Sequence, residues 1–191
     1  FYNSGLTSVT FETGTDKVVG NLFHYAEKLE NVALLDTMTT IGDSAFYGCK
    51  SLREIRLPNK LTAIEEEAFE DCTALKSIDI PDTVTRIGFS AFSGCTNLSD
   101  VSLSKNLESI GCRAFASCSS LIEIEIPKSL RSASVSYYNG VSNIVGGPFY
   151  NSGLTSVTFE TGTDKVVGNL FHYAKKLENV ALLDTMTTIG D

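Results

Sequence analysis

The stretch AFYGCKSLREIRLP, residues 45–58, decides the fold of this protein, because its pattern returns along the whole chain. The pattern A-F-x-x-C-x-x-L-x-x-I-x-L-P begins again at Ala68, Ala91 and Ala114, each time after 23 residues. Weaker copies begin at Phe1, Phe23, Phe149 and Phe171, so eight units can be counted, the last one incomplete. A fixed period of this length is typical of solenoids, in which each unit stacks on the next.

Three columns of apolar residues run through the units. They hold Leu6, Leu29, Leu52, Leu75, Leu98, Leu121, Leu154 and Leu177; then Val9, Val32, Ile55, Ile78, Val101, Ile124, Val157 and Val180; then Phe11, Leu34, Leu57, Ile80, Leu103, Ile126, Phe159 and Leu182. The last two columns are two residues apart, with mostly polar or small residues between them. This alternation predicts a short strand with one buried side. A proline ends the strand at positions 58, 81 and 127.

The Ala-Phe-x-x-Cys part of each unit returns the chain to the next strand. It is too short for a long helix, so we expect one helical turn or a 3₁₀ segment that carries the Phe inward. Ile41-Gly42, Ile87-Gly88 and Ile110-Gly111 are each expected to supply an inward Ile and a permissive Gly backbone at a corner. The predicted fold is a repeat solenoid, a right-handed β/α superhelix with a parallel β-sheet on one face and short helical or 3₁₀ turns on the other. Neighbouring strands in such a sheet lie about 4.8 Å apart.

The repeat resembles the BspA-like family of leucine-rich repeats, whose unit of about 23 residues carries the run A-F-x-x-C-x-x-L-x-x-I-x-I-P. The four central units match closely, whereas Ser4, Ala26, Ser152 and Ala174 replace the Cys in the outer units. Members of the family are typically surface or secreted proteins of bacteria that live with animal hosts, and of some parasitic protists. The resemblance therefore implies an extracellular or cell-surface location and adhesion or host-protein binding.

The organisation of the chain contains a second repeat. Residues 149–191 are a near-copy of residues 1–43, and the single difference is Lys175 in place of Glu27. We interpret residues 1–191 as one solenoid of about eight units and as a fragment of a longer array. The first residues lack the features of a secretion signal. Residues 131–143 interrupt the period, and Asn139-Gly140 predicts an inserted hairpin that stands out from the solenoid.

Residues that could carry chemistry are few, and the chain is predicted not to be an enzyme. Cys49, Cys72, Cys95 and Cys118 are 23 residues apart, which favours packing in the core over a disulfide ladder and excludes tight metal-binding pairs. Cys112 stands alone and is expected to be exposed. The histidines, His24 and His172, are copies of one another and cannot assemble a nucleophile, a base and an acid. Glu65-Glu66-Glu67 is interpreted as solvated surface, with a weak cation site as the alternative. No catalytic residue, metal or cofactor is predicted.

The net charge of the chain is −8, with 23 acidic and 15 basic residues. An acidic chain repels phosphate groups, which argues against nucleic acid and anionic lipid as partners. No apolar run is long enough for membrane insertion. The expected partner is a protein, for example a host or matrix protein, or a surface glycan, and the open ends of the solenoid allow edge-to-edge self-association.

The outward positions of the predicted sheet are the candidate partner-binding surface, since solenoids of this kind usually bind on that face. The candidates are Glu54, Arg56, Ser77, Asp79, Asp100, Ser102, Glu123 and Glu125. Their acidic character indicates a basic partner. Tyr137 and Tyr138 of the insert are a second candidate, because exposed aromatic side chains act as interface anchors. The alternative hypothesis is a structural spacer in a surface protein, with no ligand of its own.

Overall fold

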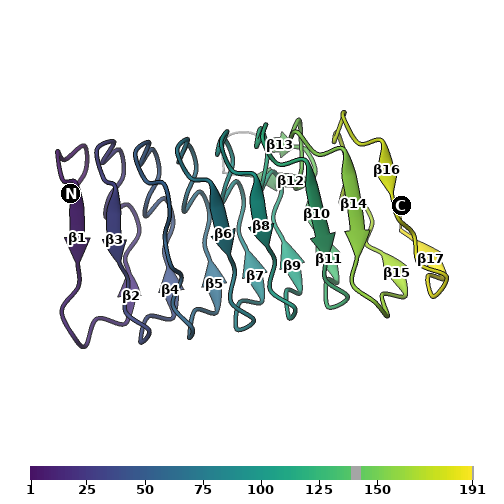
Figure 1. The fold of residues 1–191 in the computed structure, drawn as a ribbon, viewed down its shortest axis with the longest axis horizontal. Coiled ribbons are helices and arrows are strands. Elements are labelled where there is room, and N and C mark those ends of the chain that lie inside the picture. Colours follow the sequence, from purple (N-terminus) through teal and green to yellow (C-terminus); the bar gives the residue numbers. More distant parts are fainter. Residues whose placement is uncertain (139–142, 191) are drawn as a thin grey trace.

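The computed structural model describes residues 1–138 and 143–190, which form a solenoid of successive coils stacked along one axis (Figure 1). Each coil has three sides: a front face, a back face and a turn face. The front strands are β1 (Ser8–Thr10), β3 (Asn31–Ala33), β6 (Ser77–Asp79), β8 (Asp100–Ser102), β10 (Glu123–Ile126), β14 (Ser156–Phe159) and β16 (Asn179–Val180). The back strands are β2 (Lys17–Val18), β4 (Thr40–Ile41), β5 (Ala63–Ile64), β7 (Arg86–Ile87), β9 (Ser109–Ile110), β11 (Ser132–Ala133), β15 (Lys165–Val166) and β17 (Thr188–Ile189).

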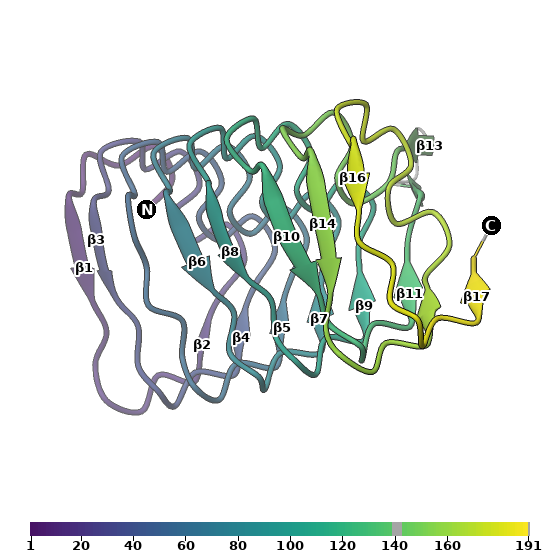
Figure 2. The same ribbon diagram turned by 45° about the vertical axis from the view of Figure 1, so that its right-hand side comes forward.

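The front strands run parallel (Figure 2). They pair in register within each ladder, so the residues of each apolar column lie opposite one another there. Ile78 of β6 is opposite Val101 of β8, and Ile124 of β10 is opposite Val157 of β14. The predicted stacking of 23-residue units is therefore confirmed. The front sheet consists of three separate ladders, β1-β3, β6-β8 and β10-β14-β16, because residues 54–57 form no strand and β8 does not pair with β10.

The back face carries a parallel sheet that the sequence analysis missed. Its six strands follow the order β11-β9-β7-β5-β4-β2, and β15 and β17 form a further ladder. The expected inward direction of Ile41, Ile87 and Ile110 is confirmed by their burial, and each of them lies in a back strand. Each back strand has two residues, one of them inward, and is too short to show an alternating pattern in the sequence.

The turn face contradicts the predicted helical or 3₁₀ segments, since the described residues contain only turns there. In the four central coils, two positions have a positive φ, one on either side of the Ala-Phe pair. In one coil these are Ser44 and Gly48, and in another they are Glu67 and Asp71. Left-handed residues interrupt any right-handed helical turn. The N–H of Phe69 instead reaches across 2.7 Å to a carbonyl of the next coil.

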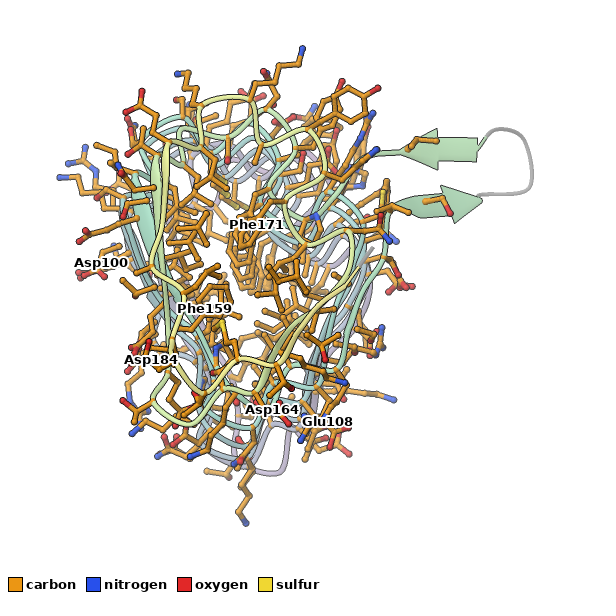
Figure 3. The ribbon with its side chains drawn as sticks, turned by 90° about the vertical axis from the view of Figure 1, so that its right-hand side faces the viewer. Asp100, Glu108, Phe159, Asp164, Phe171 and Asp184 are labelled. Carbon is orange, nitrogen blue, oxygen red and sulfur yellow. The ribbon has the colours of Figure 1, made fainter. Side chains whose placement is uncertain are left out.

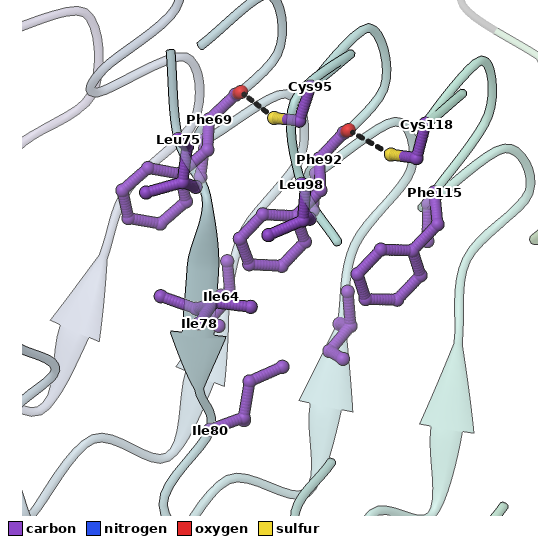
Figure 4. Packing of buried hydrophobic residues seen from close by; sticks show 14 of the residues in the cluster. Ile64, Phe69, Leu75, Ile78, Ile80, Phe92, Cys95, Leu98, Phe115 and Cys118 are labelled. Atoms are coloured by element: carbon purple, nitrogen blue, oxygen red, sulfur yellow. Dashed lines mark hydrogen bonds between the residues drawn. The ribbon is translucent and has the colours of Figure 1, made fainter. Parts of the chain in front are cut away.

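The core lies between the three sides and contains a stack of phenylalanine rings (Figure 4). The ring centroids of Phe69 and Phe92 are 5.2 Å apart, and those of Phe92 and Phe115 are 5.1 Å apart, with nearly parallel planes. This spacing follows from the distance between stacked strands. The expected inward direction of the Phe side chains is confirmed in the central coils by the complete burial of Phe46, Phe69, Phe92 and Phe115.

The insert contains β12 (Ser136–Tyr138) and β13 (Asn143–Val145), which pair antiparallel and project from the solenoid (Figure 3). At its base the guanidinium of Arg113 donates hydrogen bonds to the carbonyl of Val145, over 2.8 Å from Nη2 and 3.2 Å from Nε. The same guanidinium lies 4.5 Å above the centre of the Tyr150 ring. The side chains of Tyr137 and Tyr138, the second candidate surface, lie outside the described part of the structure.

Candidate protein-binding face

The front face holds the eight candidate side chains of the sheet, and all of them are exposed. Six of them belong to β6, β8 and β10, and Asp100 projects from the front sheet away from the core (Figure 3). Glu54 and Arg56 lie instead in the segment between β3 and β6 that forms no strand. Side chains alternate between the two sides of this extended segment. Because Ile55 and Leu57 point into the core, Glu54 and Arg56 point outward.

The face is hollowed at the N-terminal end, over β1, β3, β6 and residues 54–57. This hollow has a volume of about 660 Å³, and its walls combine uncharged side chains such as those of Ser8 and Asn31 with the charged side chains of Glu54, Arg56 and Asp79. The guanidinium of Arg56 lies 3.0 Å from the carboxylate of Asp36. Hydrogen bonds from Arg56 and from a backbone N–H lower the pKa of Asp36. The charge of Arg56 is thus already balanced within the chain.

A second hollow lies over β8, β10 and β14 and differs in charge. Its volume is about 520 Å³, and we call it the acidic groove. It is lined by Ser99, Asp100, Val101, Glu123, Ile124, Glu125, Ser156 and Thr158. The groove crosses the place where β8 and β10 form no ladder. Among the described residues, no cation forms an ion pair with any of its three carboxylates.

Ile122 lies immediately before β10 and is 58% exposed, which the sequence reasoning did not recognise. It shares a column with Arg53, Lys76, Ser99 and Thr155, all of them polar. An apolar residue in an otherwise polar column was the available signal. Between residues 20 and 136, no other large apolar side chain in the described part of the structure is exposed. Ile122 therefore places an exposed apolar side chain directly beside Glu123 of the acidic groove.

The acidic run at 65–67 is partly buried and bonded within the chain. Carboxylate oxygens of Asp43, Glu65 and Glu66 come within 4.8 Å of one another, close enough to hold a cation. Arg86 forms an ion pair with Glu65, and its Nη1 lies 3.8 Å from Glu66. Burial and a hydrogen bond with Asp43 raise the pKa of Glu66. The guanidinium of Arg86 thus balances negative charge in this cluster, in the place where a bound cation would do so.

The cysteine column is buried, and its thiols form hydrogen bonds to backbone carbonyls of the preceding coil. Burial raises the pKa of Cys49 and of Cys118 to about 12. The expected exposure of Cys112 is wrong, since only 1% of this residue is accessible. Ser134 and Ser136 of the insert line the same small hollow as Cys112, so the insert covers a position that would otherwise face solvent.

The two histidines lie on the turn face and are half-buried among aromatic rings. The ring centroid of His24 lies 4.7 Å from that of Tyr25 and 4.6 Å from that of Tyr47. Its Nδ1 is 3.0 Å from the side-chain oxygen of Asn21. These contacts account for His24 as a packed surface residue.

No helix in the described part of the structure is long and apolar enough to cross a membrane.

Comparisons with known proteins agree with this architecture. A family model described as a BspA type leucine rich repeat region matches six copies, over residues 16–145 and 132–191. No curated protein sequence matches the chain. A leucine-rich repeat protein from Bacteroides ovatus is 25% identical with a TM-score of 0.61, and the alignment covers 97% of this chain and 63% of that one.

Two further solved structures have the same fold. A leucine-rich repeat protein from T. pallidum is 24% identical with a TM-score of 0.64, over 96% of this chain and 77% of that protein. A leucine rich cell surface protein from Faecalibacterium prausnitzii is 22% identical with a TM-score of 0.56, over 92% of this chain and 59% of that protein. The chain thus spans about three fifths of the length of the Bacteroides and Faecalibacterium proteins.

Proposed function

The chain belongs to the BspA-type leucine-rich repeat family, and from this premise we propose that it is a protein-binding module of a cell-surface or secreted protein. Its front face is the surface that recognises the partner. A surface location is part of the proposal, and the Faecalibacterium relative is described as a cell surface protein. Adhesion to a host or matrix protein is the role that fits a repeat module of this kind.

The observation that supports the proposal is the contrast between the front face and the two other sides. On the turn face, backbone N–H groups bond from coil to coil, and the back sheet runs through six adjacent strands. The front face has exposed carboxylates and two hollows of about 660 and 520 Å³. Because the stacked core holds these side chains at fixed spacing, a partner would bind with little loss of conformational entropy.

Arginine substitutions on two faces test the proposal. One variant carries Ser77→Arg and Ser102→Arg on the front face, and its control carries Thr62→Arg and Thr85→Arg on the back face; all four positions are exposed. Both variants change the net charge by the same amount. Each is immobilised and exposed to a panel of purified extracellular-matrix proteins, and bound protein is measured by biolayer interferometry.

We expect at least one matrix protein to bind the wild-type chain and the back-face variant equally, and the front-face variant at least tenfold more weakly. Equal weakening by both pairs would contradict the front face as the binding surface. A folded wild-type chain that binds none of the matrix proteins would favour a structural spacer with no ligand of its own.

A further inference from the structure

The acidic groove allows a more specific inference, which rests on the proposed function. We propose that the partner contacts the front face at the acidic groove, through an extended basic segment of a protein. This segment is rich in arginine or lysine and carries a large apolar side chain beside its cations.

The first argument is charge. The lining of the acidic groove contains three carboxylates, from Asp100, Glu123 and Glu125, and no Lys or Arg. The larger hollow contains two carboxylates, from Glu54 and Asp79, together with Arg56, which is paired with Asp36. Electrostatic complementarity therefore favours the acidic groove for a basic segment, because its lining has more carboxylates and no cation.

The second argument is access to the carboxylates. Ser156 is the ladder partner of Glu123, Thr158 is that of Glu125, and Ser77 is that of Asp100. Each carboxylate thus has a short, neutral hydroxyl side chain beside it on one side. A guanidinium can approach such a carboxylate without displacing a cation of the chain, and the hydroxyl can accept a further hydrogen bond from it.

The third argument is spacing. Glu123 and Glu125 are two residues apart on β10 and both point outward. Their separation along the strand is about 6.6 Å, which is also the spacing of alternate side chains in an extended peptide. An extended segment that lies along β10 can therefore place cations at alternate positions opposite both carboxylates.

The fourth argument is the apolar contact at one end of the groove. Ile122 directly precedes Glu123 and is 58% exposed. It lies in the same column as Ser99, which lines the groove. A partner that covers Ile122 removes its apolar surface from water, which adds to the affinity. The preferred segment therefore has an apolar side chain that covers Ile122.

Binding of synthetic peptides to the whole chain tests the inference. The probe is a fluorescent seven-residue peptide with four arginines and two leucines, and the reference peptides replace either the leucines by serine or the arginines by glutamate. The groove variant carries Asp100→Asn, Glu123→Gln and Glu125→Gln. Its matched control carries Asp16→Asn, Glu108→Gln and Asp164→Asn, which removes the same charge from exposed positions that directly precede the back strands β2, β9 and β15.

At physiological salt we expect saturable binding of the arginine-leucine peptide that is about tenfold weaker for the groove variant, because three ion pairs are lost. The control variant should change the affinity less than twofold. Ile122→Ser should weaken the arginine-leucine peptide about threefold and leave the arginine-serine peptide unchanged. Serine and threonine occupy this column in adjacent coils, so the variant is expected to fold, and circular dichroism checks this.

Equal weakening by the groove and control variants would overturn the inference, since net charge alone would then explain the binding. Failure of the arginine-leucine peptide to bind would overturn it too. Binding of a neutral oligosaccharide that the groove variant abolishes would replace the partner class with a glycan. The proposed function is tested separately. If a matrix protein binds the wild-type chain but not the Ser77→Arg, Ser102→Arg variant, the front face remains the binding surface even where the peptide experiment fails.

Discussion

The thiol of Cys95 donates a hydrogen bond to the backbone carbonyl of Phe69 in the preceding coil, over 3.2 Å from Sγ to O (Figure 4). Each such thiol joins two coils beside the stacked phenylalanine rings. The same bond recurs between Cys49 and Phe23, Cys72 and Phe46, and Cys118 and Phe92. The regular spacing of the cysteines therefore reflects a structural role in the core, and the column forms no disulfide ladder.

Alkaline pH should destabilise the fold through these thiols. Burial raises the pKa of Cys118 to about 12, whereas a thiol in the unfolded chain has a pKa of about 8.5. Because the folded value is the higher one, the stabilisation is complete below about pH 8.5 and decreases as the pH rises towards 12. Urea unfolding at pH 7.5, 9 and 10 under reducing conditions should show this decrease, and it should be smaller in Cys118→Ala. A thiol reagent that modifies the column faster than the chain unfolds would contradict the buried placement.

Glu70 should make the fold less stable as the pH rises from about 4.5 to 7. Burial, followed by the neighbouring carboxylates of Glu67 and Asp71, raises the pKa of Glu70 to about 7. The folded state therefore binds this proton more tightly than the unfolded state, and the stabilisation is lost as the pH passes through 7. Glu70→Gln should raise the Tm at pH 8 and have little effect at pH 4. Thermal unfolding at both pH values checks this, with the exposed Glu54→Gln as the control; an equal gain at both pH values would contradict it.

At the positive-φ positions of the turn face, a change to glycine should stabilise the fold, and a change from glycine to alanine should destabilise it. Ser117 has a φ of 57°, so Ser117→Gly should stabilise the chain by up to about 1 kcal/mol. Gly48 has a φ of 69°, and a Cβ there would lie 2.7 Å from the Tyr25 ring. Gly48→Ala should destabilise the chain by about 1–3 kcal/mol. Both changes are measured as free energies of unfolding in urea, and a neutral Gly48→Ala would show that the turn can relax.

The phenylalanine stack should be most sensitive at its centre. Phe92 is fully buried between two rings, so Phe92→Ala should cost about 3–5 kcal/mol through the lost burial and the cavity. Phe171 is half-buried and stacks on Phe149 alone among the described rings, at 5.9 Å. Phe171→Ala should therefore cost clearly less. Equilibrium unfolding of both variants compares the two positions, and equal losses would mean that the coils do not share one continuous core.

The apolar columns were sufficient to predict the stacked front strands and the inward phenylalanines. Leu52, Leu75 and Leu98 line up in one buried file, as their period of 23 residues requires. The turn face was predicted incorrectly because the length of the Ala-Phe-x-x-Cys segment allows one helical turn, and the sequence does not show φ. Residues such as Glu67 and Asp71, which are uncommon in the left-handed region, gave no local signal for the turns that they form.

The sequence by itself determined that consecutive units stack and bury the same columns, because a unit of 23 residues cannot cover its apolar edge alone. Only the tertiary structure decided which neighbouring strands pair and which side chains are exposed on the outer surface. Whether neighbouring strands pair depends on the geometry between coils. Where β8 and β10 form no ladder, the groove holds three carboxylates that have no ion-pair partner among the described residues. The exposure of Ile122 and the burial of Cys112 likewise depend on what the adjacent coil and the insert cover, which the order of residues within one unit does not contain.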